Sequence, residues 1–219
     1  MTLKAIETQY NGYRFRSRLE ARWAVFFDKA GIKYQYEPEG FEVEVYDGEV
    51  YRYLPDFYLP EIGIYAEVKP SADMLLNDAD KIAFMIDWDG PLSDGLLILG
   101  QIPNVSLEGV PKMDGVLARV PMFPLLSWGK GIKLDYATFA KDKVVRMENT
   151  YGYTWPDYWA EAPDLPTDIK SCKDLYYVAP RLRRTIDGIA YNLDLHEIPY
   201  VAYTAARQAR FEHGEVPRG

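Results

Sequence analysis

Hydrophobic and polar side chains alternate from residue 64 to residue 69 of the chain. Successive side chains of a strand point to opposite faces, so this alternation predicts a strand with one buried face. Residues 53–59 are rich in aromatic and apolar strand formers, and the stretch 60–63, which contains Pro and Gly, predicts a turn between the two segments. The apolar face of the second strand holds Ile64, Ala66 and Val68, and the opposite face holds Tyr65, Glu67 and Lys69.

Residues 17–31, earlier in the chain, show a helical period. Apolar residues recur there every three or four positions, at Leu19, Trp23, Phe26 and Phe27. Ser17 and Glu20 stand three residues apart at the start of the run, as in a capping box, and Gly31 is a typical helix end. We predict one helix here.

Similar patterns predict strands at residues 34–38, 41–46, 50–54, 95–100 and 116–120, and helices at residues 77–88 and 200–214. Asp47 and Gly48 form a typical hairpin turn. Prolines interrupt residues 101–180, whose aromatic side chains suit either a small satellite core or a platform that stacks bases. We expect an α/β fold in which helices flank a mixed central sheet, with an aromatic-rich C-terminal insertion or extension.

Three charged residues of this region suggest chemistry. If the segments before and after the turn at 60–63 pair, Asp56 approaches Glu67 and Lys69. Two neighbouring carboxylates repel each other unless a cation lies between them, and magnesium typically binds through one or two carboxylates plus the phosphates of its substrate. A lysine beside such a site can position or activate water and stabilise developing negative charge. These are the parts of a metal-dependent phosphodiesterase.

The order Pro55-Asp56, ten residues, then Glu67-Val68-Lys69 resembles the signature of the PD-(D/E)XK nuclease superfamily, which has the restriction-endonuclease-like fold. The resemblance covers roughly residues 10–102. It implies that Asp56, Glu67 and the backbone carbonyl of Val68 bind the metal and that Lys69 assists the attacking water. The metal it implies is magnesium, for which manganese would substitute.

Glu20 has two interpretations. The simpler one is the capping box with Ser17. However, nucleases that resemble Holliday-junction resolvases and the endonuclease subunit of some transposases carry a glutamate on the first helix, and this resemblance favours Glu20 as a fourth catalytic residue. Arg16 and Arg18 lie close to Glu20 in the sequence, and we expect them to contact nucleic-acid phosphates rather than to form a solvated face.

The 219 residues suit one domain with an insertion. We expect a nuclease core at 1–102, an aromatic- and Pro-rich insertion at 103–180, and a C-terminal helical segment at 181–219 that packs on the core. A net charge of −8 argues against a general DNA-coating protein. It does not exclude a nuclease, whose metal-site carboxylates add to the negative count.

Other functional classes lack their motifs. One Cys and two His exclude a disulfide framework and a conventional zinc site. The sequence shows no apolar run that could span a membrane, no apolar signal region at its start and no Gly-rich loop for a nucleotide cofactor. We expect a cytoplasmic protein, in the host cytoplasm if a phage encodes it.

We therefore predict a magnesium-dependent endodeoxyribonuclease of phage or mobile-element origin that selects DNA by its structure. DNA is the expected partner, and a homodimer would supply the second active site that cleavage of both strands needs. RNA stays open as a substrate. The alternative is a non-catalytic module on the same fold, such as a phage interaction protein that blocks a host defence system by mimicking DNA with its acidic surface.

Overall fold

The computed structural model describes most of the N-terminal half of the chain and shorter stretches of the C-terminal half. The described residues are 6–45, 48–105, 120–128, 132–140, 143–147, 158–159, 169, 173–179, 183–186, 189–192 and 198–211. The single Cys, both His, Asp47 of the predicted turn and most of the predicted strand 116–120 lie outside these ranges.

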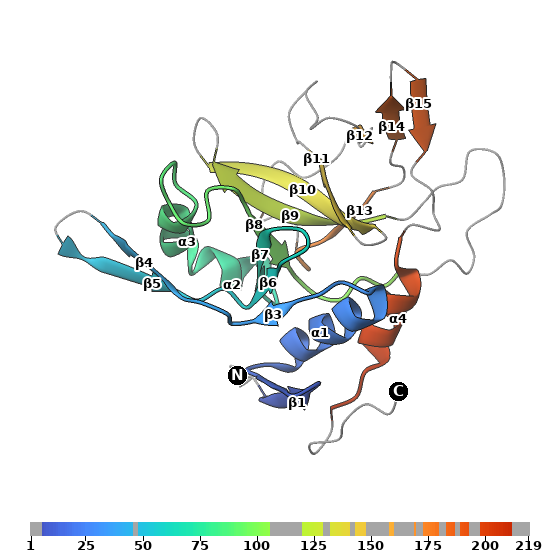
Figure 1. The fold of residues 1–219 in the computed structure, drawn as a ribbon, viewed down its shortest axis with the longest axis horizontal. Coiled ribbons are helices and arrows are strands. Elements are labelled where there is room, and N and C mark those ends of the chain that lie inside the picture. The colour runs from blue at the N-terminus through green and yellow to red at the C-terminus, as the bar shows by residue number, and fades with distance from the viewer. Residues whose placement is uncertain are drawn as a thin grey trace.

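A mixed β-sheet forms the centre of the described structure (Figure 1). Its eight strands are β3 (Gln35–Tyr36), β6 (Phe57–Leu59), β7 (Ile64–Val68), β8 (Leu96–Leu99), β9 (Val120–Trp128), β10 (Ile132–Ala140), β11 (Lys143–Met147) and β13 (Tyr177–Ala179). The order is β11-β10-β9-β8-β7-β6-β3, and β13 pairs with β9 beside this path. Within this described sheet, β7 and β8 run parallel and the other neighbouring strands run antiparallel. The predicted α/β class with a mixed sheet is confirmed.

Helices cover both faces of this sheet. On one face, α1 (Arg18–Ala30) packs against α4 (Tyr200–Gln208), as Figure 1 shows below the sheet. On the other face lie the short helices α2 (Ala72–Leu76) and α3 (Ala79–Met85). Because strand side chains alternate, β8 contributes to both cores: Leu97 and Leu99 pack with α1, and Leu96 and Ile98 pack with α2 and α3.

The predicted helix at 17–31 is confirmed at both ends. The Ser17 side chain accepts a hydrogen bond from the Glu20 amide, and Gly31 ends the helix with a left-handed φ of 71°. Trp23 anchors α1 to the sheet, because its buried indole N–H donates to the Gly100 carbonyl at 2.8 Å. The predicted helices at 77–88 and 200–214 are shorter in the structure, since α3 covers Ala79–Met85 and α4 ends at Gln208.

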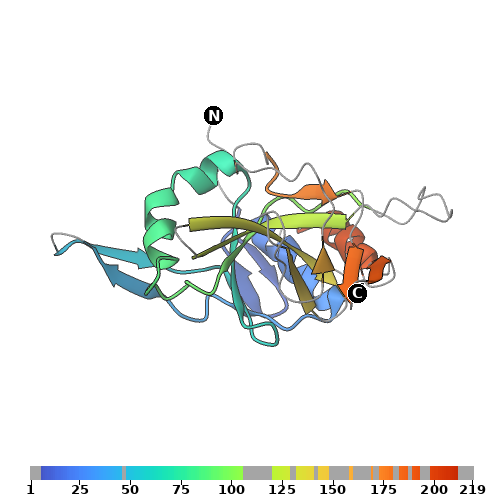
Figure 2. The ribbon, with the colours of Figure 1, turned by 90° about the horizontal axis from the view of Figure 1, so that it is seen from above.

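The described residues also form three smaller sheets outside the central one. They are the hairpin β1 (Thr8–Tyr10) with β2 (Tyr13–Phe15), the hairpin β4 (Phe41–Glu44) with β5 (Val50–Tyr53), and β12 (Tyr158–Trp159), β14 (Arg183–Ile186) and β15 (Ile189–Asn192). The β4–β5 hairpin has the predicted pairing but extends away from the central sheet in both views (Figures 1 and 2). Its apolar face packs beside α3, where the Tyr51 and Phe84 rings lie 5.3 Å apart.

The segment predicted as an insertion contributes strands to the same sheet as the expected core. β9 pairs with β8, and β10, β11 and β13 extend the sheet from β9. The domain boundaries at 102 and 180 stay a prediction. No helix in the described ranges has the length and apolar character needed to cross a bilayer.

Candidate active site

The two predicted metal-binding carboxylates lie beside each other at the edge of β6 and β7. These strands pair with Phe57 opposite Ala66, so that Asp56, directly before β6, comes opposite Glu67. Asp56 Oδ2 accepts a hydrogen bond from the Val68 amide at 2.7 Å. Asp56 and Glu67 are only 4% and 6% exposed, so two acids share a site with little access to water.

Their burial and proximity disfavour the charged forms. Burial raises the pKa of Asp56 well above its usual range, and the nearby charges of Glu67 and Glu20 raise it further. The hydrogen bond from the Val68 amide and the charge of Arg16 lower it, but by less. Burial also raises the pKa of Glu67, even though Lys69 partly offsets it. Glu67 Oε2 is buried and makes no hydrogen bond of normal geometry to any described residue, although the nearby Tyr53 hydroxyl helps to lower the pKa of Glu67. The carboxylates of this site therefore carry more negative charge than the neighbouring cations Arg16 and Lys69 balance.

Lys69 lies between two carboxylates. Its Nζ is 3.0 Å from Glu67 Oε1 and 2.6 Å from Asp78 Oδ2, and the side chain is 16% exposed. Burial alone would lower the pKa of Lys69, but Glu67 and Asp78 outweigh it, so the pKa is raised and the ammonium form is favoured. The Lys69 amide donates to the Leu99 carbonyl at 3.0 Å, which fixes the backbone to β8.

Sequence reasoning did not find Asp78, because it lies inside the helix predicted at 77–88, where charged residues normally face solvent. It also missed Tyr53, which has no distinguishing sequence signal. The Tyr53 hydroxyl is buried near Glu67, and burial together with that carboxylate raises the pKa of Tyr53. Neither the hydroxyl nor Glu67 Oε2 makes a hydrogen bond of normal geometry.

Glu20 is buried beside this site in the first turn of α1, whose N-cap is Ser17. Its Oε1 accepts from the Ser17 hydroxyl at 2.6 Å, while Oε2 accepts from the Arg16 amide at 3.0 Å and the Tyr36 hydroxyl at 2.6 Å. Both carboxylate oxygens are thus in use, yet the charge of Glu20 still acts on Asp56. Half of the capping box is confirmed: the Ser17 side chain accepts from the Glu20 amide, but the Glu20 carboxylate accepts from the Arg16 amide instead of the Ser17 amide. The catalytic role of Glu20 stays a prediction.

The two arginines expected to bind phosphate occupy different surroundings. Arg16 Nη2 lies 3.1 Å from Asp56 Oδ1 and 2.6 Å from Glu37 Oε1, although its side chain is 57% exposed. Arg18 is the first residue of α1, its Nε is buried without a hydrogen-bond partner, and the ion pairs of the described residues do not include it. The structure thus brings Arg16 to the carboxylates and leaves Arg18 apart.

A magnesium ion fits this donor set. Among the described residues, no group of three or more His, Cys, Asp or Glu side chains is arranged to hold a metal. Magnesium does not require one, since it binds through one or two carboxylates and keeps several waters. The unsatisfied Glu67 Oε2 and the repulsion between Asp56 and Glu67 are what a bound cation would relieve. The part expected of the Val68 carbonyl stays a prediction.

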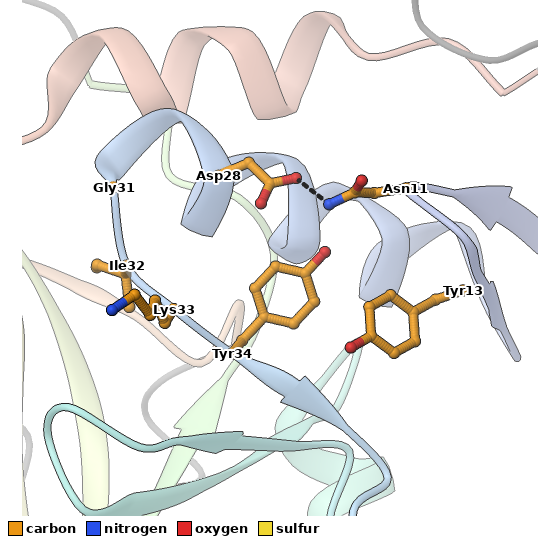
Figure 3. Close-up of a pocket in the computed structure, with 7 residues that line it drawn as sticks. All are labelled: Asn11, Tyr13, Asp28, Gly31, Ile32, Lys33 and Tyr34. Atoms are coloured by element: carbon orange, nitrogen blue, oxygen red, sulfur yellow. Dashed lines mark hydrogen bonds between the residues drawn. The ribbon is translucent and has the colours of Figure 1, made fainter.

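An open cavity of about 410 Å³ lies at the other end of α1, beside the turn between β1 and β2 (Figure 3). Its lining residues are Asn11, Tyr13, Asp28, Gly31, Ile32, Lys33 and Tyr34. Asn11 donates to Asp28 at 3.3 Å, and burial together with Asp28 raises the pKa of Tyr34 to about 12. The cavity includes none of the predicted site residues.

No protein-family model, no curated protein and no solved structure matches this chain. The geometry of the chain's own residues is therefore what indicates a function.

The raised pKa of Glu67 predicts a stability change. Because the folded state disfavours the ionised form of Glu67, ionised Glu67 lowers the free energy of unfolding at pH 8. Lowering the pH towards the ordinary Glu pKa, about 4.3, protonates Glu67 in the folded state and reduces this loss. We expect Glu67→Gln to raise the free energy of unfolding by about 1 kcal/mol at pH 8 in chelator, and by less at pH 5. Urea unfolding measures this.

The matched control is Glu61→Gln. Glu61 lies in the turn between β6 and β7, about half exposed and paired with Lys33 at 2.5 Å, so its loss should change stability by less than about 0.5 kcal/mol. A Glu67→Gln protein less stable than its parent at pH 8 would show that Glu67 is well compensated in the free protein.

Proposed function

We propose that this chain is a metal-dependent endodeoxyribonuclease with a restriction-endonuclease-like core, related to the PD-(D/E)XK nucleases. One observation carries the proposal: two buried carboxylates, Asp56 and Glu67, share a site with a lysine ammonium 3.0 Å from Glu67. Burying two acids side by side destabilises a fold, so this arrangement is expected where a cation and chemistry need it.

The arrangement of elements supports the same proposal. α1 precedes the strands β6 and β7, which bring the carboxylates together, and α2 and α3 then lead to β8 parallel to β7. This is the order in which the resembled family builds its core. The backbone hydrogen bond from Val68 to Asp56 fixes one carboxylate against the strand that carries the other.

The proposed reaction is hydrolysis of a phosphodiester bond by water. Asp56, Glu67 and the Val68 carbonyl would hold magnesium, which when bound supplies positive charge to the phosphate oxygens and lowers the pKa of a bound water. Lys69, held as an ammonium ion, orients the attacking water by hydrogen bonding and stabilises the negative charge that develops on the phosphate. The water oxygen bonds to phosphorus as the bond to the leaving oxygen breaks. The attacking water releases one proton to solvent, and the leaving oxygen takes up a proton from solvent.

Arg16 is the proposed contact to the DNA backbone at this site. Its guanidinium reaches Asp56 while more than half of the side chain stays exposed, so a phosphate can approach it from solvent. We expect Arg16→Gln to weaken DNA binding in chelator about five- to tenfold and to reduce the salt dependence of binding. Fluorescence anisotropy at several salt concentrations measures both effects.

Arg14→Gln is the control for Arg16. Arg14 is exposed on β2 and pairs with Glu7 rather than with the site carboxylates, so its loss removes one charge of the same sign nearby. Equal weakening by both variants would indicate a general charge effect and would remove Arg16 from the proposed site.

The acidic surface favours a second candidate, a non-catalytic interaction protein that mimics DNA. Residues 71–95 contain six Asp and a single Lys, and exposed Glu42, Glu44 and Glu49 lie on or beside the β4–β5 hairpin. Such a surface would bind the basic DNA-binding site of another protein. This candidate predicts no cleavage of DNA under any metal condition.

Cleavage of a DNA panel decides between the two candidates. The panel contains linear duplex, nicked duplex, flap, four-way junction and single strand, each incubated with magnesium, manganese or chelator. Metal-dependent cleavage would establish the nuclease, and the preferred substrate would name its structural selectivity. An RNA single strand added to the panel tests the open alternative. Absence of cleavage from every substrate would overturn the proposed function.

A further inference from the structure

We infer that Asp78 is a positioning residue that holds the Lys69 ammonium in place for the reaction at the Asp56–Glu67 site. This inference rests on the proposed function and adds to it a residue outside the resembled signature. Within the described residues, Asp78 forms no ion pair or hydrogen bond with the two proposed metal-binding residues. Its contact is with Lys69, through which it acts.

Among the described residues, the Lys69 ammonium contacts two carboxylates, and its contact with Asp78 is the shorter. Asp78 Oδ2 lies 2.6 Å from Lys69 Nζ, whereas Glu67 Oε1 lies at 3.0 Å. Asp78 is 35% exposed and Glu67 only 8% in side-chain terms, so the ammonium bridges an outer and an inner carboxylate. Lys69 itself is shielded from water, which strengthens both charge-assisted contacts.

The backbone around Asp78 supports this role. The Asp78 amide donates to the Leu75 carbonyl at 3.1 Å, and its carbonyl accepts from the Ile82 amide at 2.9 Å. Asp78 is therefore fixed at the junction of α2 and α3 from both sides. Although it occupies the N-cap position of α3, its side chain makes no capping hydrogen bond. The carboxylate points to Lys69 instead of satisfying its own helix.

A second anchor is needed because Glu67 has two tasks. When Glu67 binds a cation, its charge is shared with that cation, and its hold on Lys69 weakens. Lys has a flexible stem with four carbons, and the ammonium would then lose its fixed position. Asp78 keeps the ammonium in place independently of Glu67. Small displacements of a positioned group cost large factors in rate, which gives this contact its importance.

Three variants test the inference. Asp78→Ser removes the contact with Lys69 but keeps a good N-cap residue for α3. Asp78→Glu keeps the carboxylate. Asp80→Ser removes an exposed acid from the first turn of the same helix and serves as the control for lost charge. Each protein is compared with the parent in steady-state cleavage, in DNA binding with chelator and in urea unfolding.

We expect Asp78→Ser to lower kcat about 10- to 100-fold and to leave KM and DNA affinity within about threefold. Asp78→Glu should recover most of kcat, and Asp80→Ser should stay within about twofold of the parent. A kcat within twofold of the parent for Asp78→Ser would overturn the inference. The inference would also be overturned if Asp78→Ser lost stability and DNA affinity together with kcat, because such losses indicate that Asp78 maintains the fold.

The ¹⁵N-detected signal of the Lys69 ammonium gives a readout that does not need cleavage. Its protons should exchange slowly with water in the parent and in Asp80→Ser, and fast in Asp78→Ser. A parent that cleaves no DNA but shows this difference would contradict the proposed function and keep the Asp78–Lys69 contact. A parent that cleaves DNA with Lys69 exchange unchanged in Asp78→Ser would overturn the inference alone.

Discussion

Lys69→Ala should lower the rate of metal-dependent DNA cleavage by about 10³-fold. The variant removes the ammonium 3.0 Å from Glu67, and with it the charge proposed to stabilise the developing phosphate charge. Asp56→Asn should have an effect of similar size, because it removes one of the two carboxylates proposed to hold the metal. Single-turnover cleavage of the preferred panel substrate, at saturating magnesium, measures both losses.

Lys33→Ala is the control for lost positive charge. Lys33 is exposed and pairs with Glu61, away from the carboxylate site, so its cleavage rate should stay within about twofold of the parent. Urea unfolding of each variant checks that the fold is retained. Cleavage that survives both Lys69→Ala and Asp56→Asn would show that the activity comes from another site or from a contaminant.

Gly100→Ala should destabilise the protein by about 3 kcal/mol or more. A Cβ at this position would lie 1.8 Å from the Asp174 carbonyl oxygen and 2.6 Å from the Leu175 Cβ, and the first of these neighbours is backbone. The next amide, that of Gln101, donates to the same Asp174 carbonyl at 2.9 Å, so the two backbones cannot separate without losing this bond. Urea or thermal unfolding measures the loss.

Gly40→Ala is the matched control. Its Cβ would meet the nearest atom, the Tyr53 carbonyl oxygen, at an ordinary distance of 3.6 Å. We expect the free energy of unfolding to change by no more than about 1 kcal/mol. It should rise slightly if Ala reduces the conformational freedom of the unfolded chain. If Gly100→Ala were as stable as Gly40→Ala, residues 100 and 174 would not approach each other as closely as the structure has them.

Local patterns predicted the main elements near the site. Period two at residues 64–69 corresponds to β7, and the strand formers in 53–59 include β6. The helical period with its Ser17 and Gly31 ends corresponds to α1. Each signal depends on residues a few positions apart, which is why it is visible in the sequence. The same pairing brought Asp56 to Glu67, because a short connection between two strands restricts their register.

The sequence by itself determined α1, the strand segments on either side of the turn at 60–63, and the acidic pair that this turn brings together. It did not determine that the face of β7 opposite its apolar side chains is buried at Glu67, nor the strands β9 to β11. Only the tertiary structure decided which charges meet from separate elements: Asp78 with Lys69, and Glu37 with Arg16. It also decided that β4 and β5 form a hairpin outside the central sheet and that the backbone of Asp174 packs closely against Gly100. Such contacts join residues through the packing of whole helices and strands, and packing between distant segments leaves no periodic signal along the chain.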